Sequence, residues 1–203
     1  MPFPNSIYRH PLLLAAVLLA PAIGSGQTGQ IPTFQVIVPE SKIDFHVDAS
    51  VALTGVFAKW AAGLHFTTPY VQSGVLELIV QAASVKAGSS LKEGKLKGND
   101  FFAVKENPEI TFRSKKIVLT GTDAYRVDGD FTIRGLTKEE SLTLNYSPDR
   151  PDEGRIRGRM VFDRRQYGMT HGIPLIKIAD RVEVGVDLKI RRLSGPRPIQ
   201  KKE

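Results

Sequence analysis

Few side chains in this sequence could carry out chemistry, and the first to consider are three histidines beyond the N-terminal segment. His46 and His65 lie at the polar positions of two segments that alternate like β-strands. If the hairpin between them turns near residue 52, His46 faces position 58 and misses His65 by several residues, which argues against a shared metal ion. His171 lies in YGMTHGIPL, which indicates a loop. We expect a turn residue there, or a contact to a polar ligand group at a rim.

The paired carboxylates Asp128 and Asp130 are the second candidate. Two residues apart on a strand, they share one face, as an acid and a base would. The apolar Val127, Phe131 and Ile133 occupy the other face, so both aspartates are expected to point into water. The chain has no cysteine and no G-x-S-x-G, H-E-x-x-H, P-loop or dinucleotide-binding fingerprint. The sequence therefore predicts that the protein is not an enzyme and that it binds neither a cofactor nor a metal ion.

The elements that would position such groups are strands, because apolar and polar residues alternate through most of the chain. About eight strands joined by short turns favour an antiparallel meander that closes into an extended barrel, with a sandwich as the competing architecture. The segment 86–106 breaks the alternation and predicts a short helix or turn insertion. The predicted strands are KIDFHVD, GVFAKWAAGLHF, VLELIVQ, EITF, YRVDGDFTI, SLTLNY, RGRMVF and VEVGVDLKI, with FQVIV as a further edge strand.

The two ends differ from this body. Residues 1–26 combine a basic residue, a short apolar run between prolines and small residues, which is typical of a cleaved signal peptide; a retained N-terminal anchor is the alternative. We therefore expect a periplasmic or secreted protein with one barrel domain over residues 31–190. The formal charge of +7 is concentrated after Ile190. Residues 191–203 are predicted to be a basic disordered tail, which argues against a nucleic-acid partner.

Three motifs give the chain a resemblance to a known family. KLKGNDFFAVKENPEITFRS, GDFTIRGLTKEESLTL and DRRQYGMT followed by IADRVEVGVDLKI occur in this order. Together they resemble the YceI-like family of exported lipid-binding proteins over about residues 34–190. The resemblance implies an eight-stranded, lipocalin-like antiparallel barrel whose apolar lumen holds a polyisoprenoid or fatty-acyl chain, with Leu96, Phe101 and Phe102 turned inward at one end.

The resemblance and the inward phase of the strands together give a candidate ligand-binding set. A closed, packed core would use the same residues, so a filled barrel that acts as a structural or interaction module stays open, as does an enzyme that acts on a hydrophobic substrate. Transient membrane contact and a homodimer are further expectations. The predicted ligand-binding residues are Phe45, Val47, Phe57, Leu64, Phe66, Leu76, Leu78, Val80, Leu96, Phe101, Phe112, Phe131, Ile133, Leu142, Leu144, Phe162, Tyr167 and His171.

Overall fold

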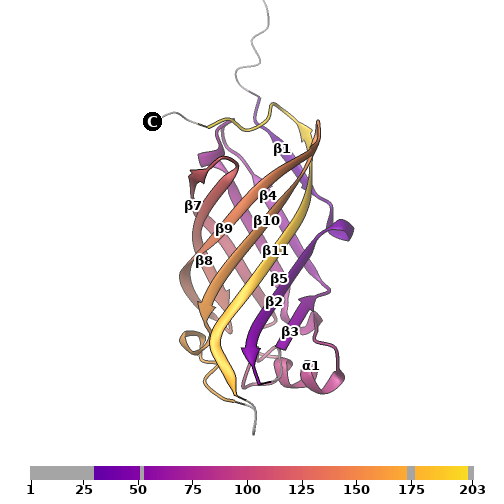
Figure 1. The fold of residues 1–203 in the computed structure, drawn as a ribbon, viewed down its shortest axis with the longest axis vertical. Coiled ribbons are helices and arrows are strands. Elements are labelled where there is room, and N and C mark those ends of the chain that lie inside the picture. The colour runs from indigo at the N-terminus through magenta and orange to yellow at the C-terminus, as the bar shows by residue number, and fades with distance from the viewer. Residues whose placement is uncertain (1–29, 51–52, 173–176, 201–203) are drawn as a thin grey trace, which may run out of the picture.

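The chain folds into an all-β antiparallel sheet that curls into an elongated, barrel-like shape (Figure 1). The computed structural model describes residues 30–50, 53–172 and 177–200. The strands are β1 (Thr33–Val36), β2 (Lys42–Ala49), β3 (Leu53–Phe57), β4 (Trp60–His65), β5 (Val75–Gln81), β6 (Val85–Lys86), β7 (Glu109–Gly121), β8 (Ala124–Ile133), β9 (Leu136–Arg150), β10 (Glu153–Asp163) and β11 (Ile178–Ser194). The helix α1 (Ser90–Lys97) and the 3-10 turns η1 (Val38–Glu40), η2 (Val71–Ser73), η3 (Ala82–Ser84) and η4 (Arg164–Tyr167) complete the described elements.

The sheet follows the order β4-β5-β7-β8-β9-β10-β11-β2-β3-β6, and β1 pairs with β11 beside this path. Most neighbours are consecutive in sequence, as in a meander. At the upper end of Figure 1, β1 approaches β4, where the rings of Phe34 and Phe66 lie 5.7 Å apart between centroids. At the lower end, the Ala58 N–H donates to the Ser84 carbonyl at 3.2 Å and joins the chain after β3 to the end of η3.

The structure corrects the predicted strand count of eight to eleven among the described residues. The predicted strand GVFAKWAAGLHF is split at Ala58 and Lys59 into β3 and β4, because the chain changes partner there: β3 pairs with β2, and β4 pairs with β5. The edge segment FQVIV supplies β1, and a two-residue strand, β6, follows η3. An alternation pattern reports which face of a strand is buried, but it does not report a change of partner.

Alternation along each strand determines which side chains enter the interior. In β8, Val127, Phe131 and Ile133 are buried, whereas Asp128 and Asp130 lie outside. Asp128 accepts a hydrogen bond from the Ser141 hydroxyl at 2.7 Å, and Asp130 pairs with a lysine. The expectation that both aspartates point outward is confirmed.

The hairpin between β8 and β9 turns through Arg134 and Gly135, both at positive φ, 55° and 70°. A two-residue turn of this kind matches the right-handed twist of the paired strands. It also places the Arg134 guanidinium where it donates to the carbonyls of Asn99 and Phe101. The hairpin thereby holds the segment after α1 against the lower end of the sheet.

The segment 86–106 contains α1, whose start is capped by the Ser89 side chain accepting from the Lys92 N–H at 3.3 Å. Leu96 is the buried residue of α1, and Phe101 and Phe102 follow it into the interior. A polar, exposed segment thus inserts three large apolar side chains into the lower end of the barrel.

The structure corrects the prediction of a disordered tail that begins at Arg191. Strand β11 continues to Ser194, because β1 pairs with its last residues and extends the sheet. Residues 195–200 then cross the upper end, where Ile199 forms a parallel bridge with Tyr70. Residues 1–26 and 201–203 lie outside the described residues, so the predicted signal peptide remains an expectation. Within the described part of the chain, no helix is long and apolar enough to traverse a bilayer.

Candidate ligand-binding lumen

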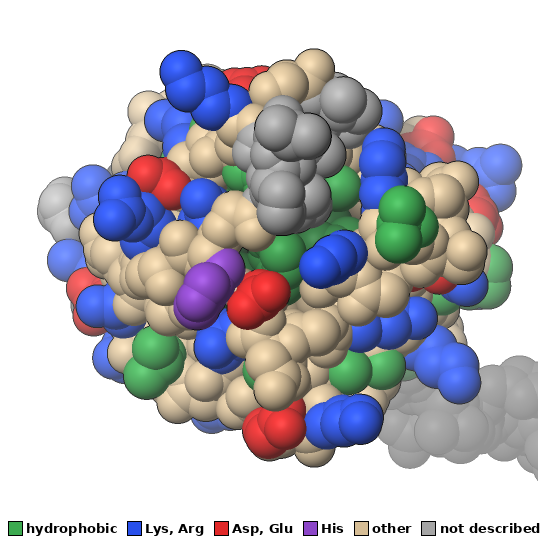
Figure 2. All heavy atoms as spheres, turned by 90° about the horizontal axis from the view of Figure 1, so that it is seen from below, with side chains coloured by type: hydrophobic (Ala, Val, Ile, Leu, Met, Phe, Trp, Pro, Cys, Tyr) green, Lys and Arg blue, Asp and Glu red, His purple; other side chains and the backbone are tan. Residues whose placement is uncertain are grey.

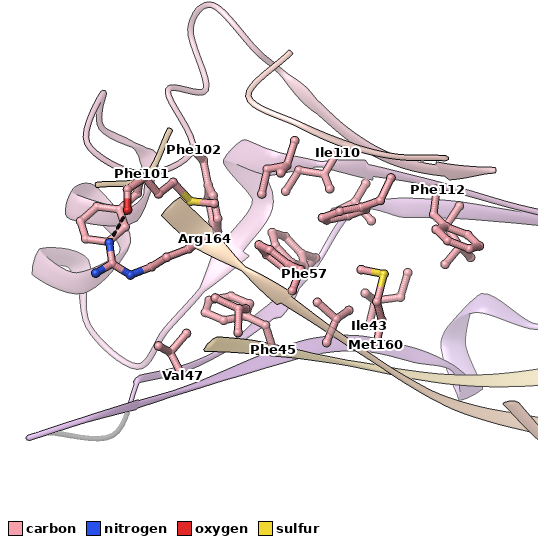
Figure 3. Close-up of a pocket in the computed structure, with 18 of the residues that line it drawn as sticks. Ile43, Phe45, Val47, Phe57, Phe101, Phe102, Ile110, Phe112, Met160 and Arg164 are labelled. Atoms are coloured by element: carbon pink, nitrogen blue, oxygen red, sulfur yellow. Dashed lines mark hydrogen bonds between the residues drawn. The ribbon is translucent and has the colours of Figure 1, made fainter. Parts of the chain in front are cut away.

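The lower half of the barrel encloses a narrow apolar cavity of about 80 Å³, here called the lower chamber (Figure 3). Side chains from β2, β3, β5 and β7 to β11 converge on it, together with side chains from the end of α1 and the segment after it. Among the lining residues only Thr111 and Arg164 are polar, and the surface that the lining presents to the cavity is apolar. They are Ile43, Phe45, Val47, Leu53, Phe57, Leu78, Val80, Leu96, Phe101, Phe102, Ile110, Phe112, Phe131, Ile133, Leu142, Met160, Phe162, Met169, Ile178, Val182, Val184 and Val186.

Three aromatic rings cluster at the α1 end of the lower chamber. Phe45 lies 5.7 Å from Phe57 and 6.0 Å from Phe102 between centroids, and Phe57 lies 5.9 Å from Phe102. Figure 3 shows the three residues at this end; the Phe45 and Phe102 rings meet edge to face, and the other two pairs are tilted. Gly55 lies opposite Phe45 in the ladder, and a Cβ there would fall 2.4 Å from the Phe45 ring. Glycine is therefore required at position 55 to leave room for the ring.

A buried guanidinium holds the rim of the lower chamber together. Arg164 is 6% exposed, and its Nε donates to the Ala179 carbonyl at 3.1 Å. Its Nη1 donates to the carbonyls of Met169 and His171, and its Nη2 lies 2.9 Å from the Asp180 carboxylate. A planar fork with five donors suits such a divided arrangement of acceptors. Arg164 thereby joins the loop after η4 to the start of β11.

The lower face of the molecule shows apolar side chains in a central hollow, with charged side chains of both signs around them (Figure 2). His171 is on this rim and is 70% exposed, with its Nδ1 3.6 Å from the Asp100 carboxylate. The side chain of His171 therefore belongs to the surface around the mouth, whereas its carbonyl is used by Arg164. His46 and His65 lie elsewhere, each beside a carboxylate of its own, and the described residues contain no cluster of three or more His, Asp or Glu placed to hold a metal.

Tyr167 supports the wall of the lower chamber instead of lining it. It is fully buried, and its ring packs on Phe131 and Phe162 at centroid distances of 5.5 and 5.2 Å. Its hydroxyl donates to Glu140 at 2.8 Å. Burial is the main cause that raises the pKa of Tyr167 above its ordinary value, and the hydrogen bond to the Glu140 carboxylate raises it further. Tyr167, one of the predicted ligand-binding residues, therefore lines neither cavity: its side chain is uncharged at neutral pH and holds two aromatic rings in place.

A constriction, here called the waist, closes the lower chamber from above. At this level β5 and β11 contribute Leu76 and Leu188, which are 1% and 0% exposed. On β7, Ser114 Oγ accepts from the Leu76 N–H at 2.8 Å, next to a bulge that interrupts the β7–β8 ladder. On β10, a Cβ at Gly158 would fall 2.3 Å from a Leu144 methyl, so leucine fills the space that a side chain at this position would take. At this level Leu76, Leu188 and the Leu144 methyl thus fill the interior of the sheet.

Above the waist lies a second cavity of about 290 Å³, here called the upper chamber. Its apolar walls come from β1, β4, β7, β8, β9, β10 and β11, and charged residues lie at its upper edge. The lining residues are Phe34, Leu64, Phe66, Val71, Ile117, Asp123, Tyr125, Val127, Leu144, Tyr146, Pro148, Pro151, Asp152, Glu153, Gly154, Ile156, Ile190, Arg192, Arg197 and Pro198.

The predicted ligand-binding residues therefore separate into groups. Leu64, Phe66 and Leu144 line the upper chamber, and Leu76, Tyr167 and His171 line neither chamber. The predicted set lacks Leu53, Met169 and Ile178, which lie outside the predicted strands. It also lacks other apolar residues that line the lower chamber, most of them in predicted strands: Ile43, Phe102, Ile110, Met160, Val182, Val184 and Val186. The predicted residues that line the lower chamber are Phe45, Val47, Phe57, Leu78, Val80, Leu96, Phe101, Phe112, Phe131, Ile133, Leu142 and Phe162.

Two solved structures have a fold similar to that of this chain. BcnA from Burkholderia cenocepacia has a similar fold at 22% identity, with a TM-score of 0.70 over 76% of this chain and 99% of that chain. A polyisoprenoid-binding domain from Saccharophagus degradans, implicated in plant cell wall breakdown, is similar at 14% identity, with a TM-score of 0.64 over 80% of this chain and 99% of that chain. Both neighbours support the fold.

Sequence relatives and a family model agree with the structural neighbours. A UPF0312 protein of Staphylococcus aureus (strain bovine RF122 / ET3-1) is 29% identical over 93 residues, which cover 43% of this chain and 52% of that protein. A UPF0312 protein of Azotobacter vinelandii is 22% identical over 94 residues, 46% of this chain and 49% of that protein. The chain spans about half the length of these curated relatives. The family model described as the YceI-like domain matches residues 34–190, and the chain therefore belongs to the YceI-like family.

Proposed function

We propose that this protein binds one isoprenoid or fatty-acyl chain in its lower chamber and acts as an extracytoplasmic carrier, without catalysis. The observation that carries the proposal is the lining of the lower chamber, which apart from Thr111 and Arg164 is entirely apolar. A polyisoprenoid-binding domain among the structural neighbours supports the same ligand class. Removal of apolar area from water at about 25 cal/mol per Å² would drive binding, less the entropy lost on ordering the chain.

The size of the lower chamber sets a condition on this function. At about 80 Å³ it is smaller than the roughly 300 Å³ at which small-molecule sites begin. A chain that enters must therefore displace side chains, and the Phe45, Phe57 and Phe102 rings at the mouth are the ones it meets. Ring rotation about χ1 and χ2 opens a path without breaking a backbone ladder.

Head-group recognition would fall to the rim. The guanidinium of Arg164 already donates to three carbonyls and pairs with Asp180, so it offers an anionic head group little unused capacity. We therefore propose that affinity follows the length of the hydrocarbon chain more than the charge of its head. Asp100 and His171, exposed and 3.6 Å apart, are our candidates for contact with a head group.

The decisive experiment measures a guest directly. Protein purified from an extracytoplasmic fraction without detergent should show, by native mass spectrometry, a bound species that extracts into organic solvent as a lipid. After delipidation, titration with cis-parinaric acid should saturate at one equivalent. A delipidated protein that takes up neither this probe nor a prenyl alcohol would replace the carrier proposal with a filled barrel that acts as an interaction module.

Export is a separate part of the proposal, because it rests on residues 1–26 alone. N-terminal sequencing of the exported protein should begin between Ser25 and Gln30. An intact Met1 in that fraction would contradict a cleaved signal.

A further inference from the structure

We propose that the upper chamber is a second, independent binding site for a compact, uncharged aromatic or branched apolar molecule. Its cavity volume of about 290 Å³ exceeds that of the lower chamber and is close to the lower limit for small-molecule sites. The two chambers have no lining residue in common among the described residues. A guest that fills one need not touch the other.

The waist makes this separation physical. Four strands each have one inward-facing residue that lies between the two sets of lining residues and belongs to neither. These residues are Leu76 on β5, Ser114 on β7, Gly158 on β10 and Leu188 on β11. The two leucines are at most 1% exposed, and the Ser114 hydroxyl is used by the Leu76 N–H. A chain that passed from one chamber to the other would have to displace the side chains of Leu76, Ser114 and Leu188, and the Leu144 methyl that fills the space beside Gly158.

The upper end is closed by residues 195–200, here called the C-terminal strap, which lies beyond the family domain. The Ile199 N–H donates to the Pro69 carbonyl at 2.9 Å, and the Ile199 carbonyl accepts from the Val71 N–H at 2.9 Å. Arg197 donates to the Pro151 carbonyl at 3.0 Å. The strap and the waist bound the chamber at both ends, which favours a compact guest over a long chain.

The walls indicate the chemistry of the guest. Phe34 and Phe66 form one tilted pair, and Tyr125 and Tyr146 add two further rings to the lining. Aromatic walls favour a flat ring system through edge and offset contacts. At the upper edge Arg192 pairs with Asp152, Arg197 donates to the Pro151 carbonyl, and Glu153 pairs with Lys189 and Arg191. An uncharged guest therefore costs no broken ion pair.

The test uses 2-naphthol as the probe and fills each chamber in turn. In the unsubstituted protein, one equivalent of 2-naphthol should bind with the same affinity, within twofold, in the absence and presence of saturating cis-parinaric acid. Ile117→Trp places a large ring in the upper chamber and should weaken 2-naphthol binding at least tenfold. The matched variant Leu78→Trp fills the lower chamber. Its affinity for 2-naphthol should stay within twofold of that of the unsubstituted protein, and its affinity for cis-parinaric acid should fall.

The outcomes separate this proposal from the lipid-carrier function. Loss of 2-naphthol binding in Leu78→Trp, or competition between the two probes, would show one continuous tunnel and overturn the second site. Absence of 2-naphthol binding to the unsubstituted protein at millimolar concentration would overturn it as well. Because 2-naphthol is titrated alone, failure of cis-parinaric acid to bind would leave this result intact. Leu64→Trp replaces Ile117→Trp if the latter does not fold.

A second measurement tests the strap as the cover. Ile199→Pro removes the N–H that bonds Pro69, whereas Ile199→Ala keeps it and changes a side chain that is 52% exposed. Stopped-flow release of 2-naphthol should become at least fivefold faster in Ile199→Pro and stay within twofold in Ile199→Ala. Equal release rates in all three proteins would show that the strap does not cover the site.

Discussion

At the scale of single residues, two buried side chains have roles that follow from their contacts. Leu78 points into the lower chamber from the middle of β5, where it pairs across the ladder with Phe112. Arg164 points to the rim, with its guanidinium shared among backbone carbonyls and Asp180. The first contributes volume to the lumen and the second contributes hydrogen bonds to its edge, so substitutions at the two positions should have different effects.

Leu78→Trp should separate an open lumen from a packed core. Overpacking of a filled core costs about 1 to 3 kcal/mol, whereas a lumen that accommodates a guest can take the ring in place of the lipid. We expect the variant to stay folded, with a melting temperature in lipid-free protein equal to or above that of the parent, and to lose the co-purifying ligand. An easily unfolded variant of a parent that never held a guest would favour the filled-barrel alternative.

Arg164→Met should destabilise the protein by about 2 to 4 kcal/mol, because hydrogen bonds from a charged donor contribute about 1.5 to 3 kcal/mol each and the abandoned carbonyls are poorly hydrated. The measurement is the free energy of unfolding in urea. The control is Arg165→Met, because Arg165 is exposed and adjacent in sequence. Equal losses of unfolding free energy in the two variants would mean that the buried hydrogen bonds of Arg164 contribute no more to stability than the exposed side chain of Arg165.

At the scale of elements, the β8–β9 hairpin and α1 show how turns position the lower end. Gly135 has a φ of 70°, and a Cβ there would lie 2.9 Å from the Asn107 side-chain oxygen. Gly94 lies in α1, and a Cβ there would meet nothing within 4 Å. The same glycine-to-alanine change therefore has opposite consequences at the two positions.

Gly135→Ala should lower the free energy of unfolding by about 1 to 2 kcal/mol, the usual cost of a left-handed conformation for a residue with a Cβ. Gly94→Ala should instead raise it by about 0.5 to 1 kcal/mol, since alanine favours the helix. Thermal and urea unfolding of both variants test the pair. A neutral Gly135→Ala would contradict the strained turn and the close approach to Asn107.

At the scale of the whole molecule, an ion cluster joins β9, β10 and β11 at the outer face. The Lys189 ammonium contacts Asp149 and lies 3.1 Å from Glu153. Hydrogen bonds from Lys189 lower the pKa of Asp149, and those from Lys189 and then Arg191 lower the pKa of Glu153. The same bonds to Asp149 and Glu153 raise the pKa of Lys189. Folding stability should therefore depend on pH at two extremes.

Carboxyl groups with lowered pKa values stabilise the fold above their unfolded pKa values, near 4, and lose this contribution as pH falls through the folded values. Lysine with a raised pKa stabilises the fold below about 10.5 and loses its contribution as pH rises through the folded value. Melting temperature should thus fall below about pH 4 and above about pH 10.5. In Lys189→Met the melting temperature should fall less steeply at acid pH than in the parent protein. In the control Lys105→Met, at an exposed position, the pH dependence of the melting temperature should match that of the parent.

Ligand affinity should behave differently from stability. Because the lower chamber is lined by apolar groups and a permanently charged arginine, the dissociation constant for cis-parinaric acid should change less than twofold between about pH 6 and 8. A steep sigmoid in that window, lost in His171→Gln, would instead assign His171 a contact with the head group.

Much of the lower chamber could be predicted from sequence because period-two alternation directly marks the inward face of a strand. Phe45, Phe112 and Phe131 follow from this rule, and Leu96 and Phe101 follow from the resemblance to a family motif. The rule places Leu76 and Leu144 inward as well, but it does not say at which height along the barrel each lies. That height depends on the stagger between neighbouring strands, which no local pattern reports.

The sequence by itself determined the fold class, the inward faces of the strands and the outward position of Asp128 and Asp130, because these depend on local periodicity. Only the tertiary structure decided where β3 gives way to β4, that residues 191–200 pack on the sheet, and that the lumen holds two cavities with different lining residues. Each of these results from contacts between residues far apart in the chain, such as Leu76 with Ser114 and Ile199 with Pro69. The free energy of these contacts depends on the curled shape of the whole sheet, which no single segment determines.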